Sequence, residues 1–257
     1  YVATAAAAAD GVRAQLYDAS RGVLSRSSRA GRVSGDGYAS DYAFMIHGLL
    51  ELYQATTDDA VVAWAVALQR RQDELFRDDA SGGYYSTSGT DASILLRSRE
   101  YDDGAEPSPN AMTAMNLLVL AQLTGEDAYR ERAGWVLTAA AGALGEMPGA
   151  MPLMMSALER FHATPRQVIV AGGDQAAGAD ALLRAVREQY LPNTVVLSVS
   201  GGPEQDALAR RLPYVRNMSP RDGHATAYIC EGHTCREPIS DAASLRRRLA
   251  EGDQGQA

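Results

Sequence analysis

Two segments of this chain repeat one another, and this repeat limits the possible folds more than any other feature. Residues 49–65 read LLELYQATTDDAVVAWA and residues 117–133 read LLVLAQLTGEDAYRERA, so 8 of 17 positions are identical at an offset of 68. An Asp-Gly pair precedes each copy, at Asp36-Gly37 and at Asp103-Gly104. Such a repeat is typical of stacked helical hairpins, because one hairpin cannot bury its apolar face alone. The chain is therefore expected to contain at least two similar hairpins.

The spacing of the apolar residues predicts the helices of these hairpins and their burial. Helices are expected at 1–19, 39–56, 58–76, 112–123, 126–141 and about 152–161. The first helix of each copy is apolar on nearly all sides, whereas the second is apolar on one face only, so we expect inner and outer helices to alternate. The Arg-, Ser- and Gly-rich stretch 21–37 is predicted to be a long connection. Alternating buried and exposed helices are typical of a helical toroid.

After residue 164 the pattern changes to strands that alternate with helices. Strands are expected at 167–171, 194–199 and 225–230, and helices at 179–190, 203–212 and 240–249. This alternation implies a small parallel sheet. We therefore predict a mainly α chain. Residues 1–164 would form a partial (α/α) six-hairpin toroid, about half of an (α/α)6 barrel, and residues 165–257 an α/β subdomain with a short parallel sheet.

The overall charge and composition argue against several classes of partner. The formal net charge of -8 and the pI near 5.0 argue against nucleic acid and anionic membranes as partners, because both attract clustered cations. No apolar run approaches the ~20 residues that span a bilayer. Only two cysteines are present, so a disulfide-dense secreted scaffold is not expected and a cytoplasmic location is favoured. Because the chain begins at Tyr1, we expect it to be a fragment or a processed product.

Most of the polar residues that could carry chemistry lie in two loops, each of which precedes an inner helix. The first loop is residues 35–42 and the second loop is residues 97–110. In a toroid both loops would lie at one rim, where carboxylates could bind sugar hydroxyls, aromatic rings could stack on sugar faces, and paired carboxylates could act as acid and base. The candidate catalytic residues are Asp41, Asp102, Asp103 and Glu106, and the candidate substrate-binding residues are Tyr38, Tyr42, Arg97, Ser108 and Asn110.

An alternative interpretation assigns these polar residues to the architecture of the loops. Asp36, Asp41, Asp103 and Ser108 could cap helices or form turns, as these residue types commonly do. His47 lies on an apolar helix and is interpreted as a core residue rather than as a base.

Two further segments resemble ligand sites, but their patterns are incomplete. Cys230, His233 and Cys235, with His224 nearby, could bind zinc, yet their spacing departs from the usual ligand pairs. The alternative is a hairpin in which the two cysteines face each other and could form a disulfide. Gly172-Gly173-Asp174 follows a predicted strand, but it lacks the phosphate-loop pattern. We therefore expect no metal and no cofactor.

Several motifs resemble those of a known family. They are GYASDYAF at 37–44, Arg97 with YDDGAEPSPN at 101–110, YLPN at 190–193, AYIC at 227–230 and TC at 234–235. In order along the chain, they resemble the C-terminal part of the thioredoxin-domain-containing spermatogenesis-associated protein 20 family. Ser40 departs from the family pattern, in which an acidic residue commonly precedes the Asp-Tyr pair, and the position of His47 is variable.

The resemblance implies a fold and a set of missing neighbours. Family members resemble a thioredoxin-like domain joined to a six-hairpin toroid, which is related in fold to glycosidases and N-acylglucosamine 2-epimerases. The N-terminal half of the toroid and the thioredoxin-like domain would then lie outside this chain. The leading hypothesis is a carbohydrate-binding or carbohydrate-processing module, of the sugar hydrolase or epimerase type if it is an enzyme, with a saccharide as its ligand. The alternative is a non-catalytic scaffold that positions the redox domain against client proteins.

Overall fold

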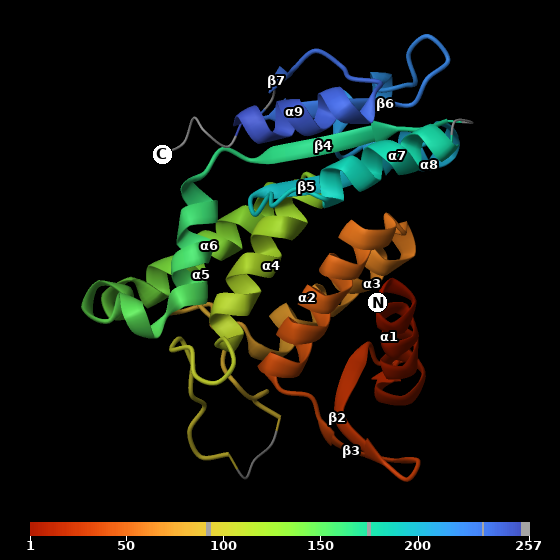
Figure 1. The fold of residues 1–257 in the computed structure, drawn as a ribbon. Helices are drawn as coiled ribbons and strands as arrows, with labels where there is room; N and C mark the ends of the chain where they lie inside the picture. The colour runs from red at the N-terminus through yellow and green to blue at the C-terminus, as the bar shows by residue number, and fades with distance from the viewer. Residues whose placement is uncertain (91–93, 174–175, 233, 253–257) are drawn as a thin grey trace. The chain divides into compact units, whose positions relative to one another are not determined.

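The computed structural model describes residues 1–90, 94–173, 176–232 and 234–252. The chain divides into two compact units (Figure 1). The helical unit comprises Tyr1–Ala121 and Asp127–His162, and the α/β unit comprises Gln122–Glu126 and Ala163–Ala257. Helices dominate the described residues and a mixed sheet lies in the second unit, which confirms the predicted fold class of a mainly α chain with an α/β part.

The helical unit contains all the helices that were predicted for it. They are α1 (Val2–Leu16), α2 (Ala39–Thr56), α3 (Asp59–Phe76), α4 (Pro109–Thr124), α5 (Asp127–Glu146) and α6 (Pro152–His162), with a short 3-10 helix η1 (Pro148–Ala150) before α6. α2 has the predicted bounds, and α3 begins one residue later than predicted because Asp58 caps it by accepting a hydrogen bond from the Ala60 N–H at 2.9 Å.

The contrast between inner and outer helices is present in both hairpins. Almost every side chain of α4 is buried or half-buried, and α2 is buried on several sides, whereas α3 buries one face that includes Trp64, Leu68 and Phe76. α2 and α4 are joined by the buried amide of Asn116, which donates to the Ala43 carbonyl at 2.8 Å. The two inner helices of the repeat therefore pack directly on each other.

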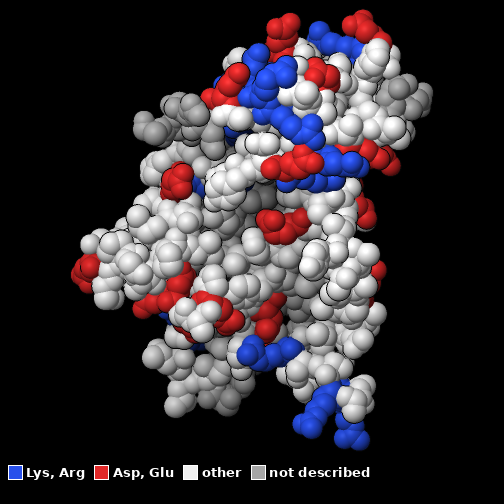
Figure 2. Space-filling view, in the orientation of Figure 1, with Lys and Arg blue, Asp and Glu red and all other residues white. Residues whose placement is uncertain are grey.

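The segment at 21–37 folds as a β-hairpin, so the prediction of a long connection was wrong. β2 (Val23–Arg29) pairs antiparallel with β3 (Arg32–Asp36), and a short β1 (Tyr17–Asp18) pairs with the start of β2. Ala30 and Gly31 form the turn with positive φ values of 51° and 75°, the backbone that a two-residue hairpin turn requires. The hairpin is the lower red segment in Figure 1, and basic side chains lie at its tip in Figure 2.

The α/β unit contains a four-stranded sheet in the order β5-β4-β6-β7. Its elements are β4 (Arg166–Ala171), α7 (Ala176–Arg187), β5 (Thr194–Val199), α8 (Gly202–Ala209), a 3-10 helix η2 (Pro213–Asn217), β6 (Thr226–Glu231), β7 (Thr234–Cys235) and α9 (Ala242–Gly252). β4 and β5 are parallel as predicted, but β6 runs antiparallel to β4, so the sheet is mixed. The connection that contains α8 and η2 delivers β6 at the carboxyl end of β4, where Thr226 pairs with Ala171, and the strand can only run back from there.

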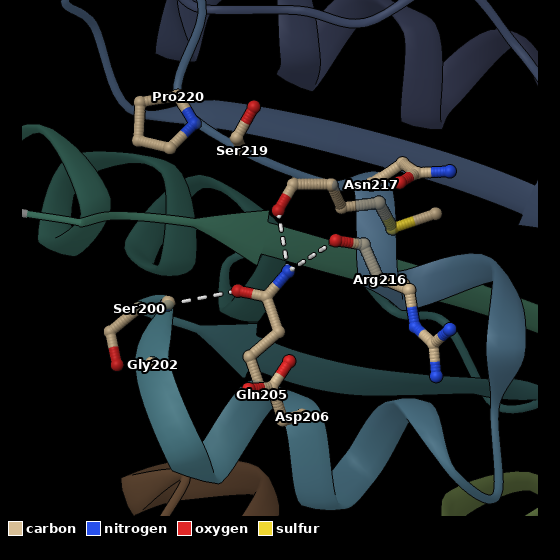
Figure 3. Close-up of a pocket in the computed structure, with 10 residues that line it drawn as sticks. Ser200, Gly202, Gln205, Asp206, Arg216, Asn217, Ser219 and Pro220 are labelled. Atoms are coloured by element: carbon tan, nitrogen blue, oxygen red, sulfur yellow. Dashed lines mark hydrogen bonds between the residues drawn. The ribbon is translucent and has the colours of Figure 1, made fainter.

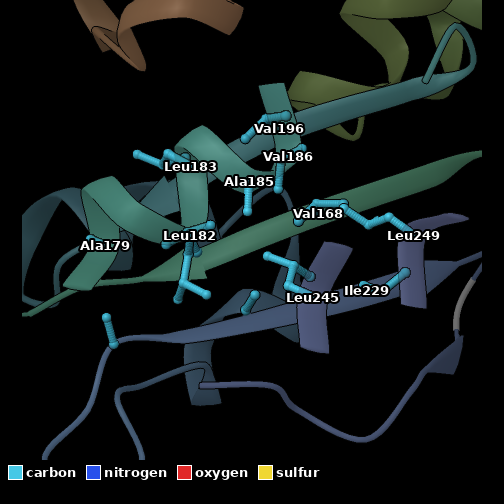
Figure 4. Close-up of a cluster of buried hydrophobic side chains, with 13 residues drawn as sticks. Val168, Ala179, Leu182, Leu183, Ala185, Val186, Val196, Ile229, Leu245 and Leu249 are labelled. Atoms are coloured by element: carbon cyan, nitrogen blue, oxygen red, sulfur yellow. The ribbon is translucent and has the colours of Figure 1, made fainter. Parts of the chain in front are cut away.

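The core of the α/β unit lies between one face of the sheet and two helices. α7 contributes Leu182, Leu183 and Val186, and α9 contributes Leu245 and Leu249 (Figure 4). These side chains pack on β-branched residues of the three longer strands, namely Val168, Val170, Val196 and Ile229. β4 lies between β5 and β6, and its residues 168–171 are fully buried, so its sequence is a continuous apolar run.

The two cysteines pair across the β6–β7 hairpin. Cys230 lies directly opposite Cys235 in the antiparallel register, and the two residues form a disulfide. Of the two interpretations of this segment, the structure has the disulfide-linked hairpin. His233 and Asp174, which belong to the zinc and phosphate-loop hypotheses, lie outside the described residues.

Candidate functional site

A cavity of about 450 Å³ in the helical unit contains candidate residues from both loops. We call it the α2 cavity, since the first turns of α2 form one wall. It is lined by Val12, Leu16, Leu24, Ser25, Arg26, Ser40, Asp41, Phe44, Met45 and Glu106. Asp41 comes from the first loop and Glu106 from the second. The two loops therefore meet at one cavity, and each places a carboxylate there.

Asp41 is oriented by two hydrogen bonds that both reach its Oδ2 atom. The Tyr38 backbone N–H donates at 2.7 Å, which is the reach-back half of a helix capping box, and Nη1 of Arg26 donates at 2.9 Å. The Asp41 side chain remains 30% exposed. Among the described residues no hydrogen bond reaches Oδ1, so that oxygen is available to a ligand in the α2 cavity.

Arg26 connects the β-hairpin to the rim of the cavity. Besides its ion pair with Asp41, its guanidinium carbon lies 4.2 Å from the ring centroid of Tyr38. This stacking fixes the guanidinium plane and leaves its other N–H groups for an acceptor. The Arg26 side chain is half-exposed, at 46%.

Glu106 brings the second carboxylate to the cavity with few constraints. Its backbone carbonyl accepts the Gly104 N–H at 2.9 Å, which closes a turn in the second loop. Its side chain is exposed, and within the described part of the chain its carboxylate makes no hydrogen bond or ion pair. In contrast to the two carboxylates, Leu16, Phe44 and Met45 supply apolar surface to the same cavity. The α2 cavity is therefore amphipathic.

Two other candidates in the second loop serve as helix caps. Asp103 accepts the Ser108 N–H at 2.7 Å and the Leu153 N–H at 2.8 Å, so it holds the starts of both α4 and α6. The Ser108 hydroxyl donates to the Tyr101 carbonyl at 2.9 Å and accepts the Ala111 N–H at 3.2 Å. For these two residues the structure has the capping interactions of the alternative interpretation.

Asn110 and Arg97 are also engaged with the backbone. Asn110 is fully buried; its Oδ1 accepts the Tyr84 N–H at 2.7 Å, and its Nδ2 donates to the carbonyls of Tyr84 and Glu100, both at 2.9 Å. Arg97 donates to the carbonyls of Thr87 at 2.9 Å and Leu75 at 3.2 Å. Both side chains thus hold the segment between α3 and α4 in place. Neither residue lines the α2 cavity.

The remaining candidates occupy contrasting positions. Asp102 is exposed, and Tyr38 lies beside the cavity under Arg26. Tyr42 is fully buried, packs edge-on against Phe76, and accepts the Leu24 N–H at 2.9 Å through its hydroxyl. Tyr42 also lines a separate, smaller cavity. His47, which was interpreted as a core residue, is half-buried on α2.

Sequence reasoning did not find Arg26 and Ser25, because both lie on the β-hairpin that was expected to be a connection. The available signal was the Ala-Gly pair at 30–31, flanked by segments that include Val23, Leu24 and Val33. Without that hairpin, no sequence pattern places a guanidinium next to Asp41.

A second open cavity, of about 430 Å³, lies in the α/β unit beyond the carboxyl end of β5. Gln205 of α8 holds its walls together: its Nε2 donates to the Met218 carbonyl at 2.8 Å, and its Oε1 accepts the Gly201 N–H at 2.9 Å (Figure 3). The same Nε2 also donates to the Val215 carbonyl at 2.7 Å. Arg216 and Asp206 place opposite charges on the lining. None of the candidate residues from the two loops lies there, and the only sequence signal is the Gly-Gly pair at 201–202 between a strand and a helix.

Comparison with known proteins gives the family of the chain. No family model matches it. Human spermatogenesis-associated protein 20 is 38% identical over 214 residues, which are 83% of this chain, and the rat and mouse proteins of that name are 37% and 36% identical over 93% and 96% of it. The chain belongs to the spermatogenesis-associated protein 20 family. The predicted family resemblance is thereby confirmed.

The chain corresponds to only a part of the spermatogenesis-associated protein 20 relatives. It covers 27% of the human protein, 31% of the rat protein and 32% of the mouse protein. Among the described residues of this family member, no helix combines the length and the apolar character that a bilayer crossing needs. The same residues contain no cluster of three or more His, Cys, Asp or Glu side chains arranged to hold a metal ion.

Proposed function

We propose that the α2 cavity binds a saccharide. The observation that carries the proposal is that Asp41 and Glu106, from the two loops of the repeat, line one cavity together with the guanidinium of Arg26. Its volume of about 450 Å³ is in the range of small-molecule sites, roughly 300–1,000 Å³. Carboxylates and a guanidinium supply the acceptors and donors that sugar hydroxyls need.

The apolar wall supports the same class of ligand. A sugar ring carries hydroxyls around its edge and C–H groups on its faces, so it needs a site that is polar on one side and apolar on the other. Phe44 and Met45 provide the apolar side, and they lie one turn after Ser40 and Asp41 on the same helix. Helical spacing therefore places both kinds of surface on one cavity wall.

We propose distinct roles for the two carboxylates if the site is catalytic, as a sugar hydrolase or an epimerase would require. Asp41 is held in place by Arg26 and by the Tyr38 N–H, and we propose that it stabilises the positive charge that develops on a sugar. The Glu106 carboxylate is not held by any interaction among the described residues, so it is the group proposed to exchange a proton with the ligand.

We also propose that the two hairpins form part of a closed toroid in the longer relatives. The packing of α2 on α4 through Asn116 and Ala43 supports this proposal, since adjacent inner helices contact each other in a ring of hairpins.

Calorimetric titration with neutral mono- and oligosaccharides tests the proposed function, using this chain and a full-length family member. At least one sugar should bind, and Glu106→Gln should weaken its binding about tenfold or more, since charge-assisted hydrogen bonds contribute roughly 1.5–3 kcal/mol. Glu131→Gln is the matched control, because Glu131 is exposed on α5 and does not line the cavity. Failure of every sugar to bind both proteins, or equal effects of the two substitutions, would contradict the proposal.

A further inference from the structure

The tip of the β2–β3 hairpin is a basic surface on a chain whose formal net charge is -8 (Figure 2). Residues 27–34, which form this tip, contain Arg29 and Arg32 and no acidic residue. Both arginines are exposed, and neither forms an ion pair within the described part of the chain. We propose that the tip, together with the outer edge of β3, binds an acidic segment of a partner protein in an extended conformation.

The two arginines face each other across the hairpin. Arg29 lies directly opposite Arg32 in the antiparallel register, and like charges at such positions destabilise a strand pair. The next pair on the same face is Ser27 and Ser34, whose hydroxyl oxygens are 3.0 Å apart. The fold thus gains nothing from the two guanidiniums, whereas a carboxylate placed beside both would replace their repulsion by charge-assisted hydrogen bonds.

The positive charge of the tip is not balanced by the acidic residues near the base of the hairpin. Asp41 is paired with a third arginine, Arg26, at 2.9 Å. Asp36 lies four residues from Arg32 along β3, roughly 13 Å at the usual rise of a strand. That distance exceeds the Debye length of about 8 Å at physiological ionic strength. An acidic ligand at the tip is therefore attracted by two uncompensated charges.

The outer edge of β3 offers backbone groups to an extended peptide. β3 is at the end of the sheet order β1-β2-β3, and all five of its residues are exposed. The two-residue turn at 30–31 makes Arg29 and Arg32 a hydrogen-bonded pair. In the next pair the N–H and C=O of Val33 consequently point away from β2. An added strand can pair with these two groups, as in other complexes formed at a sheet edge.

These features favour an acidic peptide over a nucleic acid. Pairing at a sheet edge requires backbone N–H and C=O groups at the spacing of a strand, which a polypeptide has. Alternate side chains of the added strand would meet the arginines on one face and Val33, which is 50% exposed, on the other. A nucleic acid would gain only the charge interactions, and the net charge of -8 would repel its many phosphates.

This inference goes beyond the proposed saccharide site and does not depend on it. The hairpin contributes Leu24, Ser25 and Arg26 to the lining of the α2 cavity, and the tip at 27–34 contributes nothing to it. An acidic peptide should therefore not compete with a neutral sugar, and either proposal can fail while the other holds.

Fluorescence anisotropy of labelled peptides, measured with this chain, tests the inference. The probe is a short peptide of alternating Thr and Glu, and the reference is the same peptide with Gln in place of each Glu. The acidic peptide should bind about tenfold more tightly than the reference, because two exposed ion pairs form only with the acidic peptide. Its affinity should fall as the salt concentration rises.

Variants of the hairpin separate the charges from the strand edge. Arg29→Gln and Arg32→Gln should each weaken binding of the acidic peptide about two- to fivefold, and the double variant about tenfold. Arg70→Gln is the matched control, since Arg70 is exposed on α3 outside the hairpin, and it should keep the dissociation constant of the unsubstituted chain. Val33→Pro removes the outward N–H at an edge position where proline is tolerated, and it should weaken binding about fivefold or more.

Circular dichroism on each variant verifies folding. If Val33→Pro does not fold, slower hydrogen exchange of the Val33 amide on peptide binding tests the edge pairing instead. Unchanged binding by folded Val33→Pro, or an unprotected Val33 amide, would overturn the inference.

A single-stranded oligonucleotide of similar length distinguishes a peptide site from a general polyanion surface. The inference is overturned if the acidic peptide does not bind, if it binds no more tightly than the Gln reference, or if the oligonucleotide binds more tightly than the acidic peptide. It is also overturned if the double variant of Arg29 and Arg32 binds the acidic peptide as tightly as Arg70→Gln does.

Discussion

The first and second loops have similar compositions but use their polar residues differently. In the first loop Asp41 lines the α2 cavity, and only one of its two oxygens accepts hydrogen bonds from the described residues. In the second loop Asp103, Ser108 and Asn110 all make backbone hydrogen bonds within the protein, and Glu106 is the residue that lines the cavity. Similar loops in a repeat can therefore diverge, since the second loop uses most of its polar side chains to pair backbone groups of the protein.

We attribute this difference to the length of irregular chain whose backbone each loop must pair by hydrogen bonds. The first loop joins a β-hairpin to α2 with few residues, and the Gly37 N–H is paired with the Leu24 carbonyl at 2.9 Å. The second loop lies in the long irregular segment between α3 and α4, whose backbone N–H and C=O groups need partners where they are buried, as at Tyr84. Asn110 supplies three of these partners. The polar side chains of the second loop thus supply hydrogen bonds to the backbone that a helix or a sheet would otherwise supply.

The largest expected effect is on stability, from the second loop. Asn110→Ala removes three hydrogen bonds and leaves buried backbone groups of Tyr84 unpaired, so the free energy of unfolding should fall by about 3–5 kcal/mol. Urea unfolding followed by circular dichroism measures this change. Asp102→Ala is the control in the same loop, because Asp102 is exposed, and it should change stability by less than about 0.5 kcal/mol.

A smaller loss is expected for the double cap in the second loop. Asp103→Ala removes the acceptors for the Ser108 and Leu153 N–H groups at the starts of α4 and α6, which should lower stability by about 2 kcal/mol. Saccharide affinity should not change once the variant is folded. Thermal unfolding and calorimetry on the same sample check both statements, and a selective loss of sugar binding would show that Asp103 has a role beyond capping.

Asp41 should combine a modest structural effect with a functional one. Asp41→Asn keeps an oxygen that can accept the Tyr38 N–H but loses the charge that attracts Arg26, so stability should fall by about 1 kcal/mol or less. Saccharide affinity should fall about tenfold. Measuring both quantities shows whether Asp41 differs in role from Asp103. If Asp41 were purely structural, Asp41→Asn would lower stability and leave saccharide affinity unchanged.

The smallest stability effect is expected at Glu106. Its carboxylate makes no interaction among the described residues, so Glu106→Gln should alter the free energy of unfolding by less than about 0.5 kcal/mol. Urea unfolding checks this value. A larger loss would mean that Glu106, like Asn110, serves the fold.

The helices could be predicted from the sequence because their periodicity is local information. α2 was predicted with its observed bounds, and the strands of the α/β unit were placed within one residue of β4, β5 and β6. The β-hairpin at 23–36 was missed because polar arginines and serines dominate it and the pairing of β2 with β3 comes from the Ala30-Gly31 turn. The direction of β6 was missed because it depends on where the preceding connection ends, which no local pattern encodes.

The candidate site could be predicted only as a set of residue types. Composition identifies Asp41, Asp103 and Asn110 equally well as polar loop residues, but which of them meets a ligand depends on backbone groups far away in sequence. Asn110 is paired with Tyr84, 26 residues earlier, and Asp103 with Leu153, 50 residues later. The structure has capping interactions at Asp41, Asp103 and Ser108, and sequence alone could not show which of these residues also lines a cavity.

Hydrogen–deuterium exchange with and without a saturating saccharide is the sharpest test of saccharide binding in the α2 cavity, because it reports on both loops and on both units at once. Binding there should slow exchange in peptides that cover Leu24–Arg26 and Ser40–Met45 and leave exchange around Asn110 unchanged, and this pattern would support it. Slower exchange confined to residues 200–206 and 216–220, which line the cavity of the α/β unit, or no change anywhere, would contradict it.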